Sequence, residues 1–133
     1  MKALVVEDDF TSRKVLQKLL IENFETDIAV DGEEAWIAFK QAFTNNEKYD
    51  VIFLDIMMPK KDGLQLLIEI RQFEEENGVL GLDGVKVIMT TALDDSKNVL
   101  NAFKAGCEGY VVKPYNRQKI YDKLEELGLM NGE

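Results

Sequence analysis

The sequence predicts an α/β fold in which one parallel β-sheet is covered on both faces by helices. Short apolar runs alternate along the chain with longer stretches whose apolar residues recur every three or four positions. That alternation is typical of repeated strand–helix units. The first and third strand-like runs are apolar throughout, as expected of strands buried on both faces of a sheet. A length of 133 residues suits one domain, so we expect a single domain over residues 1–133 with its core at about residues 2–128.

The first part of the chain contains two predicted strands and two helices. Residues 3–6 (Ala-Leu-Val-Val) form an apolar first strand. The helix that follows should be capped by Thr11 or Ser12, because small hydroxyl side chains accept hydrogen bonds from the first helical N–H groups. Residues 26–30 form a second strand closed by an Asp-Gly turn. Aromatic residues spaced three and four apart then predict a helix over residues 33–43.

The most hydrophobic run, residues 51–54, is the third predicted strand and ends at an aspartate. A Pro- and Gly-containing loop separates it from a helix over residues 64–73. Residues 74–84 form an acidic, glycine-rich connector to the fourth strand, residues 85–90. The remaining elements are a helix capped by Asp95 or Ser96 that ends before Gly106, a strand over residues 109–112 and a helix capped by Asn116. Right-handed crossovers between five such strands give the flavodoxin-like order 2-1-3-4-5.

Composition excludes several kinds of chemistry. The chain has no histidine, one cysteine (Cys107) and a net charge of −9. A histidine general base, a Ser-His-Asp triad and an intramolecular disulfide are therefore impossible. The acidic balance argues against direct nucleic-acid binding, which depends on Lys and Arg. No apolar run approaches a membrane span, so we expect no membrane insertion and a cytoplasmic location. We expect Cys107 to be a buried small apolar residue.

Polar and charged side chains follow four of the predicted strands. In a parallel sheet, ligands bind beyond the carboxyl ends of the strands. Glu7, Asp8 and Asp9 follow the first strand, and Asp55 follows the third. Because these neighbouring strands lie about 4.8 Å apart, the carboxylates crowd together and need a cation or a proton. Oxygen ligands favour Mg²⁺. Thr91 and Lys113 follow the fourth and fifth strands at the same edge. Each residue alone has a purely structural explanation, but four strands that all end in such groups at one edge are rarely fortuitous.

These strand ends resemble those of CheY-like response-regulator receiver domains of bacterial two-component signalling. The resemblance covers the chain to about Leu127. Any one of the motifs is weak, but together and in this order they are specific. They are Leu4-Val5-Val6-Glu7-Asp8-Asp9, Leu54-Asp55-Ile56-Met57-Met58-Pro59 with Asp62-Gly63, Thr91-Ala92 and Gly109-Tyr110-Val111-Val112-Lys113-Pro114.

The resemblance implies a phosphorylation-activated signalling switch rather than an enzyme. Asp55 would accept a phosphoryl group from a histidine kinase or phosphotransfer protein. The implied Mg²⁺ (or Mn²⁺) ligands are Asp8, Asp55, the backbone carbonyl of Met57 and, through water, Glu7. Thr91 and Lys113 would contact the phosphoryl group, and Ala92 would leave its approach open. Pro114 would follow a cis peptide bond, and Tyr110 would turn inward on activation. Met57 and Leu93 would flank the path of the water that hydrolyses the phosphoryl group. A downstream protein partner would then bind the face of the fourth helix, fifth strand and fifth helix.

Three other functions compete with the switch. An aspartyl-phosphate phosphatase similar to haloacid dehalogenases needs a second acid two residues after the nucleophile, where this chain has Met57. In a flavodoxin with this sequence, the acids after the first strand would repel the phosphate group of the flavin. A constitutive interaction module with the same fold stays open. We expect a stand-alone protein, although a fragment of a longer regulator also fits. We expect the 74–84 connector to be a tolerated insertion that, at most, adds a partner contact through Val79, Leu80 and Leu82.

Overall fold

Five parallel strands form one sheet in the order β2-β1-β3-β4-β5, which confirms the predicted order. The computed structural model describes residues 1–58, 61–92 and 96–130. The strands are β1 (Lys2–Val6), β2 (Glu25–Ala29), β3 (Val51–Asp55), β4 (Lys86–Thr91) and β5 (Gly109–Val112). The three central strands are buried along nearly their whole length, as their predominantly apolar sequences predict.

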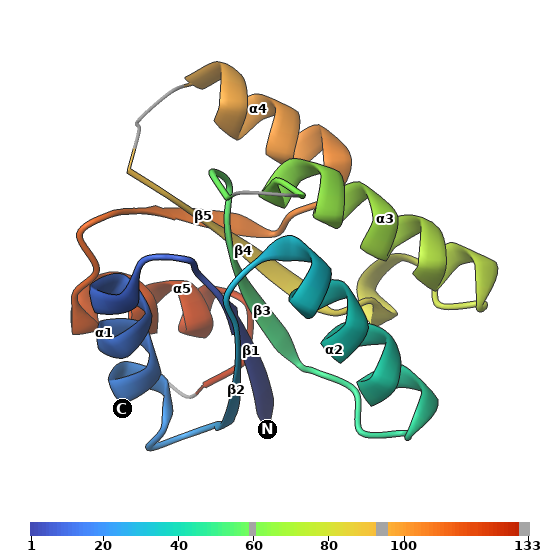
Figure 1. Cartoon of the computed structure of the whole chain (residues 1–133), viewed down its shortest axis with the longest axis horizontal. Helices are drawn as coiled ribbons and strands as arrows, with labels where there is room; N and C mark the ends of the chain where they lie inside the picture. The colour runs from blue at the N-terminus through green and yellow to red at the C-terminus, as the bar shows by residue number, and fades with distance from the viewer. Residues whose placement is uncertain (59–60, 93–95, 131–133) are drawn as a thin grey trace.

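Helices cover both faces of this sheet (Figure 1). They are α1 (Phe10–Leu20), α2 (Gly32–Thr44), α3 (Gly63–Glu76), α4 (Ser96–Ala105), α5 (Arg117–Glu126) and the short 3₁₀ helix η1 (Gly81–Asp83). α1 and α5 pack one apolar cluster against the sheet through Leu16, Leu20, Ile120 and Leu124. α2, α3 and α4 bury a second cluster on the other face. The fold is therefore the predicted three-layered α/β arrangement.

Four helices begin directly after an Asp or Asn residue whose side chain caps the helix. In each, the side-chain oxygen accepts a hydrogen bond of 2.8 Å from the backbone N–H three residues later. The capping residues are Asp9, Asp31, Asp62 and Asn116. The prediction of Thr11 or Ser12 as the first cap was wrong, because Asp9 already accepts from the Ser12 N–H. The predicted cap at Asp95 or the Ser96 side chain lies outside the described residues.

The segment between α3 and β4 differs from its prediction. α3 continues to Glu76 instead of ending at residue 73, and β4 begins at Lys86 instead of residue 85. α3 continues past residue 73 because the Glu74 side chain faces inward and is buried. Its carboxylate accepts hydrogen bonds from the Arg71 guanidinium at 2.7 Å and from the Val85 backbone N–H at 2.8 Å. Part of the predicted connector is therefore a packed helix end.

Arg71 joins this helix end to the segment between α4 and β5. Its guanidinium donates to the Gly106 carbonyl at 2.8 and 3.0 Å and to the Glu108 carboxylate at 2.8 and 3.2 Å. Glu108 in turn accepts from the Val87 N–H at 2.7 Å. The Arg71 network therefore fixes the end of α3, the end of α4 and the start of β4 relative to one another.

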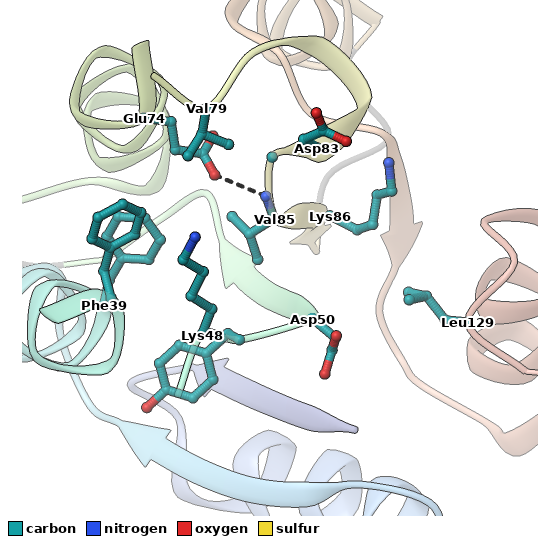
Figure 2. Close-up of a pocket in the computed structure, with 12 residues that line it drawn as sticks. Phe39, Lys48, Asp50, Glu74, Val79, Asp83, Val85, Lys86 and Leu129 are labelled. Carbon is teal, nitrogen blue, oxygen red and sulfur yellow. Dashed lines mark hydrogen bonds between the residues drawn. The ribbon is translucent and has the colours of Figure 1, made fainter. Parts of the chain in front are cut away.

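A cavity of about 260 Å³ lies beside this network, where β3 and β4 begin. Figure 2 shows its lining, including Phe39, Val79 and Val85, and the hydrogen bond from the Val85 N–H to Glu74. Because it opens at the amino ends of parallel strands, the cavity lies at the rim opposite Asp55, which ends β3.

Candidate functional site

Three acidic side chains meet at the carboxyl ends of β1 and β3. One carboxylate oxygen from each of Glu7, Asp8 and Asp55 lies within 4.8 Å of the others. Glu7 and Asp55 are buried, whereas Asp8 is exposed. β1 and β3 are paired in register up to Val6 and Leu54, so the residues that follow in each strand lie side by side. The predicted juxtaposition of these acids is confirmed.

The donor set fits a hard divalent cation. All three groups offer carboxylate oxygens, which Mg²⁺ prefers, and one of them is open to water, which Mg²⁺ retains as a ligand. Bringing these carboxylates together without a cation is unfavourable because like charges repel and burial removes water from them. The cluster therefore has the composition of a magnesium or manganese site.

Lys113 supplies a positive charge in direct contact with two of these acids. Its Nζ lies 2.6 Å from Glu7 Oε1 and 3.1 Å from Asp55 Oδ2. The backbone holds this residue too, because the Lys113 N–H donates to the Thr91 carbonyl at 2.7 Å. The Lys113–Pro114 peptide bond is cis, as predicted. One ammonium group thus pairs with two buried carboxylates.

The two buried carboxylates titrate differently. Burial and the neighbouring Glu7 raise the pKa of Asp55 to about 7, although the Lys113 ammonium and the Met57 N–H, 3.0 Å from Asp55 Oδ1, act in the opposite direction. Burial also disfavours ionised Glu7, but hydrogen bonds with Asp55, Lys113 and the Asp9 N–H lower its pKa overall. In the metal-free protein, Asp55 therefore takes up a proton more readily than Glu7 does.

Tyr115 is a site residue that sequence reasoning missed. It follows Pro114, and its hydroxyl donates a hydrogen bond of 3.0 Å to Glu7 Oε1. Burial and the nearby carboxylates raise the pKa of this phenol above its usual range, so it remains a hydrogen-bond donor. A tyrosine two residues after a predicted site lysine was the available signal, since a tyrosine hydroxyl removed from water usually has a polar partner. Arg13 also contributes, because its Nη1 donates to the Glu7 carbonyl at 3.1 Å.

The other predicted residues lie around this centre. Thr91 ends β4 and is buried, and Ala92 after it is exposed. The Met57 side chain is exposed. Tyr110 is half-buried in β5 and packs edge-to-face against Phe103 of α4, with ring centroids 6.1 Å apart. Leu93, predicted to flank the path of a hydrolytic water, lies outside the described residues.

The fold and this site define a receiver domain. The chain belongs to the response regulator receiver domain family, which it matches over residues 3–125. It is therefore a CheY-like receiver domain of two-component signalling. Among the described residues, no helix has both the length and the apolar character needed to cross a membrane.

Two curated relatives illustrate the range of proteins that contain this domain. The chain is 34% identical over 136 residues to a chemotaxis protein CheY homolog of Campylobacter jejuni, covering 100% of this chain and 97% of that protein. It is 36% identical over 130 residues to the osmosensing histidine protein kinase SLN1 of Saccharomyces cerevisiae, covering 95% of this chain but 10% of the kinase. The matching region is thus nearly a whole protein in one relative and a small part of the other.

Solved structures agree with the fold. A chain in the CheX-CheY-BeF₃-Mg²⁺ complex from Borrelia burgdorferi matches with a TM-score of 0.81 and 29% identity, over 98% of this chain and 90% of that one. A chain in the complex of the Saccharomyces cerevisiae phosphotransfer protein Ypd1 with the Ssk1 receiver domain matches with a TM-score of 0.84 and 26% identity, over 96% and 88%.

Proposed function

We propose that this protein is a signalling switch that is activated when Asp55 accepts a phosphoryl group from a histidine kinase or phosphotransfer protein. One observation carries the proposal: the Asp55 carboxylate lies within 4.8 Å of those of Glu7 and Asp8 and 3.1 Å from the Lys113 ammonium. A carboxylate that must react with an anionic phosphoryl group needs positive charge on both sides. This arrangement offers acids for a cation and, in contact with Asp55, the ammonium group of Lys113.

The chemistry requires a nucleophile that is ionised near neutral pH. An Asp55 oxygen forms a bond to phosphorus while the phosphorus–nitrogen bond of a donor phosphohistidine breaks, and the bonding electron pair remains on the imidazole nitrogen. A bound Mg²⁺ or Mn²⁺ supplies the charge neutralisation that lets two anions approach. Asp8, Asp55, the Met57 carbonyl and, through water, Glu7 would hold that ion. Hydrolysis reverses the modification when water bonds to phosphorus and the Asp55 oxygen departs.

Two more residues would contact the phosphoryl group itself. Lys113 would pair with a phosphoryl oxygen from the side opposite the cation, since its Nζ already reaches Asp55. The Thr91 hydroxyl would donate to another oxygen from the end of β4, the strand next to Asp55 in the sheet. Ala92 would leave that approach unobstructed, and Pro114 would orient Lys113. Charge-assisted hydrogen bonds of this kind are the strong ones available to a phosphoryl group.

Output would come from a shift between two conformations. When Thr91 moves toward the phosphoryl group, Tyr110 would turn inward and change the surface formed by α4, β5 and α5. A change from 1:99 to 99:1 requires about 5.5 kcal/mol of preference for the active state. Tyr110 is half-buried against Phe103 of α4, so its rotation would alter the face that a downstream protein binds. The relatives that were crystallised with CheX and with Ypd1 support protein partners for this chain.

The competing function is a receiver fold that binds a partner without being phosphorylated. Incubation with acetyl phosphate and Mg²⁺, followed by intact-protein mass spectrometry, distinguishes the two. We expect one added phosphoryl group on the wild type and on Asp122→Asn, an exposed control aspartate in α5. We expect none on Asp55→Asn or in excess EDTA. An unmodified wild type, or an undiminished adduct on Asp55→Asn, would contradict the proposal.

A further inference from the structure

We propose that Tyr115 is a positioning residue that holds Glu7 in place while Lys113 transfers from Glu7 to the phosphoryl group on Asp55. The inference rests on the proposed function and extends it to a residue outside the predicted site. It follows from the way in which three hydrogen-bond donors share the Glu7 carboxylate.

The first step is that Lys113 pairs with Glu7 more closely than with Asp55. Its Nζ lies 2.6 Å from Glu7 Oε1, compared with 3.1 Å from Asp55 Oδ2. A phosphoryl group on Asp55 extends beyond the carboxylate and offers new anionic oxygens. For the ammonium to reach them, its contact with Glu7 has to weaken. The resting pair between Lys113 and Glu7 therefore opposes phosphorylation.

The second step is that Glu7 cannot be left unpaired. It is 1% exposed, and an ionised carboxylate without partners in such a place is strongly unfavourable. Besides any water on a bound cation, two donors from the chain itself remain when Lys113 departs. The Tyr115 hydroxyl lies 3.0 Å from Oε1, the oxygen that Lys113 vacates, and the Asp9 N–H lies 3.1 Å from Oε2. Tyr115 is thus the donor that stays on the vacated oxygen.

The third step is that Tyr115 is itself fixed and carries no charge. Its ring packs against the apolar cluster beneath α1 and α5, so the hydroxyl keeps its position when Lys113 moves. A neutral donor stabilises Glu7 without adding a cation that would compete with Lys113 for the phosphoryl oxygens. Removing the hydroxyl leaves Glu7 more dependent on Lys113 and makes the lysine harder to release.

The test measures binding of BeF₃⁻, a phosphoryl analogue, by ¹⁹F NMR titration with Mg²⁺ saturating for each variant. Tyr115→Phe should weaken BeF₃⁻ binding about ten-fold, the effect of one charge-assisted hydrogen bond. Its Mg²⁺ affinity should change less than about two-fold, because the Tyr115 hydroxyl contacts Glu7 and not the direct cation ligands Asp8 and Asp55. In a Glu7→Gln background, where the side chain is neutral and no longer retains Lys113, the same substitution should have almost no effect on BeF₃⁻ binding.

The outcomes separate this inference from the proposed function. If Tyr115→Phe binds BeF₃⁻ as the wild type does, Tyr115 has no role and the inference is overturned. If the substitution weakens binding equally in the wild-type and Glu7→Gln backgrounds, its role is merely structural and the inference is overturned as well. If the wild type itself binds no BeF₃⁻ with Mg²⁺, the proposed function fails first. Urea unfolding of each variant in EDTA confirms that the comparison is made between folded proteins.

Discussion

Replacing Arg71 with methionine should destabilise the fold more than the loss of any exposed ion pair would. The substitution keeps most of the aliphatic stem but removes every donor that the guanidinium gives to Glu74, Gly106 and Glu108. Breaking a buried pair by removing one partner costs about 3–5 kcal/mol. The Glu74 side chain, 7% exposed, incurs that cost, whereas the Glu108 side chain, 26% exposed, is partly compensated by water. We expect a loss of about 3–5 kcal/mol, a large part of an ordinary domain's stability.

The measurement is the free energy of unfolding from urea titrations followed by circular dichroism, at neutral pH and in EDTA. Arg117→Met provides the matched control. Arg117 pairs with Glu22 at 3.1 Å, but both side chains are more than half exposed, so its loss should be less than about 1 kcal/mol. A second variant, Arg71→Met with Glu74→Gln, keeps an acceptor for the Val85 N–H and removes the buried charge. It should recover about 1–3 kcal/mol.

Two results would refute this reasoning. The first is an Arg71→Met protein whose free energy of unfolding falls by no more than that of Arg117→Met. The second is a double variant that is less stable than Arg71→Met, since that would place the cost in lost packing and not in the unpaired Glu74 carboxylate.

Three further predictions concern other parts of the molecule. Because burial and Glu7 raise the pKa of Asp55 to about 7, the stability that its protonated form contributes is present below the unfolded pKa of about 4 and is lost as pH rises through 7. In EDTA, the stability of Asp55→Asn relative to the wild type should therefore increase as pH rises from about 4 to about 7, and a difference in melting temperature that stays constant over this range would contradict this. Gly32→Ala should cost about 1–3 kcal/mol in urea unfolding, because the new Cβ would meet the Lys61 carbonyl oxygen and Cβ; a neutral effect would mean that the loop yields freely. Burial and Glu108 raise the pKa of the Cys107 thiol to about 11, so at about pH 8 a thiol reagent should label the native protein far more slowly than the urea-unfolded one, and equal rates would exclude this environment.

The topology could be predicted from the sequence because its cause is local. Most of the strands are short, mainly apolar runs between amphipathic stretches, and the right-handed crossover rule leaves few ways to arrange five strand–helix units. The same reasoning predicts that the Glu7 and Asp55 carboxylates lie close together, since residues at the carboxyl ends of adjacent parallel strands share one edge of the sheet. Their contact required no knowledge of side-chain conformations.

Other features could not be predicted because they depend on partners that are distant in the chain or on competition between neighbours. The hydrogen bond from Tyr115 to Glu7 joins residues 108 positions apart, and nothing in either segment specifies it. Asp9 could have been a cation ligand or a helix cap, and the structure makes it the cap in preference to Thr11 or Ser12. Glu74 lies in an acidic run that suggests solvent, and its burial depends on Arg71.

The two rims of the sheet hold different groups of residues. The carboxyl ends of the strands hold the acids, Lys113 and Tyr115, whereas the amino ends hold the Arg71 network and the cavity beside it. An extra segment introduced after Gly78, a glycine that must itself be kept because its φ is +79° but around which the space is open, would lengthen the chain on the side away from Asp55. The molecule thus provides an attachment point for a reporter or an additional recognition sequence, with the length of the strands separating it from the proposed phosphorylation site.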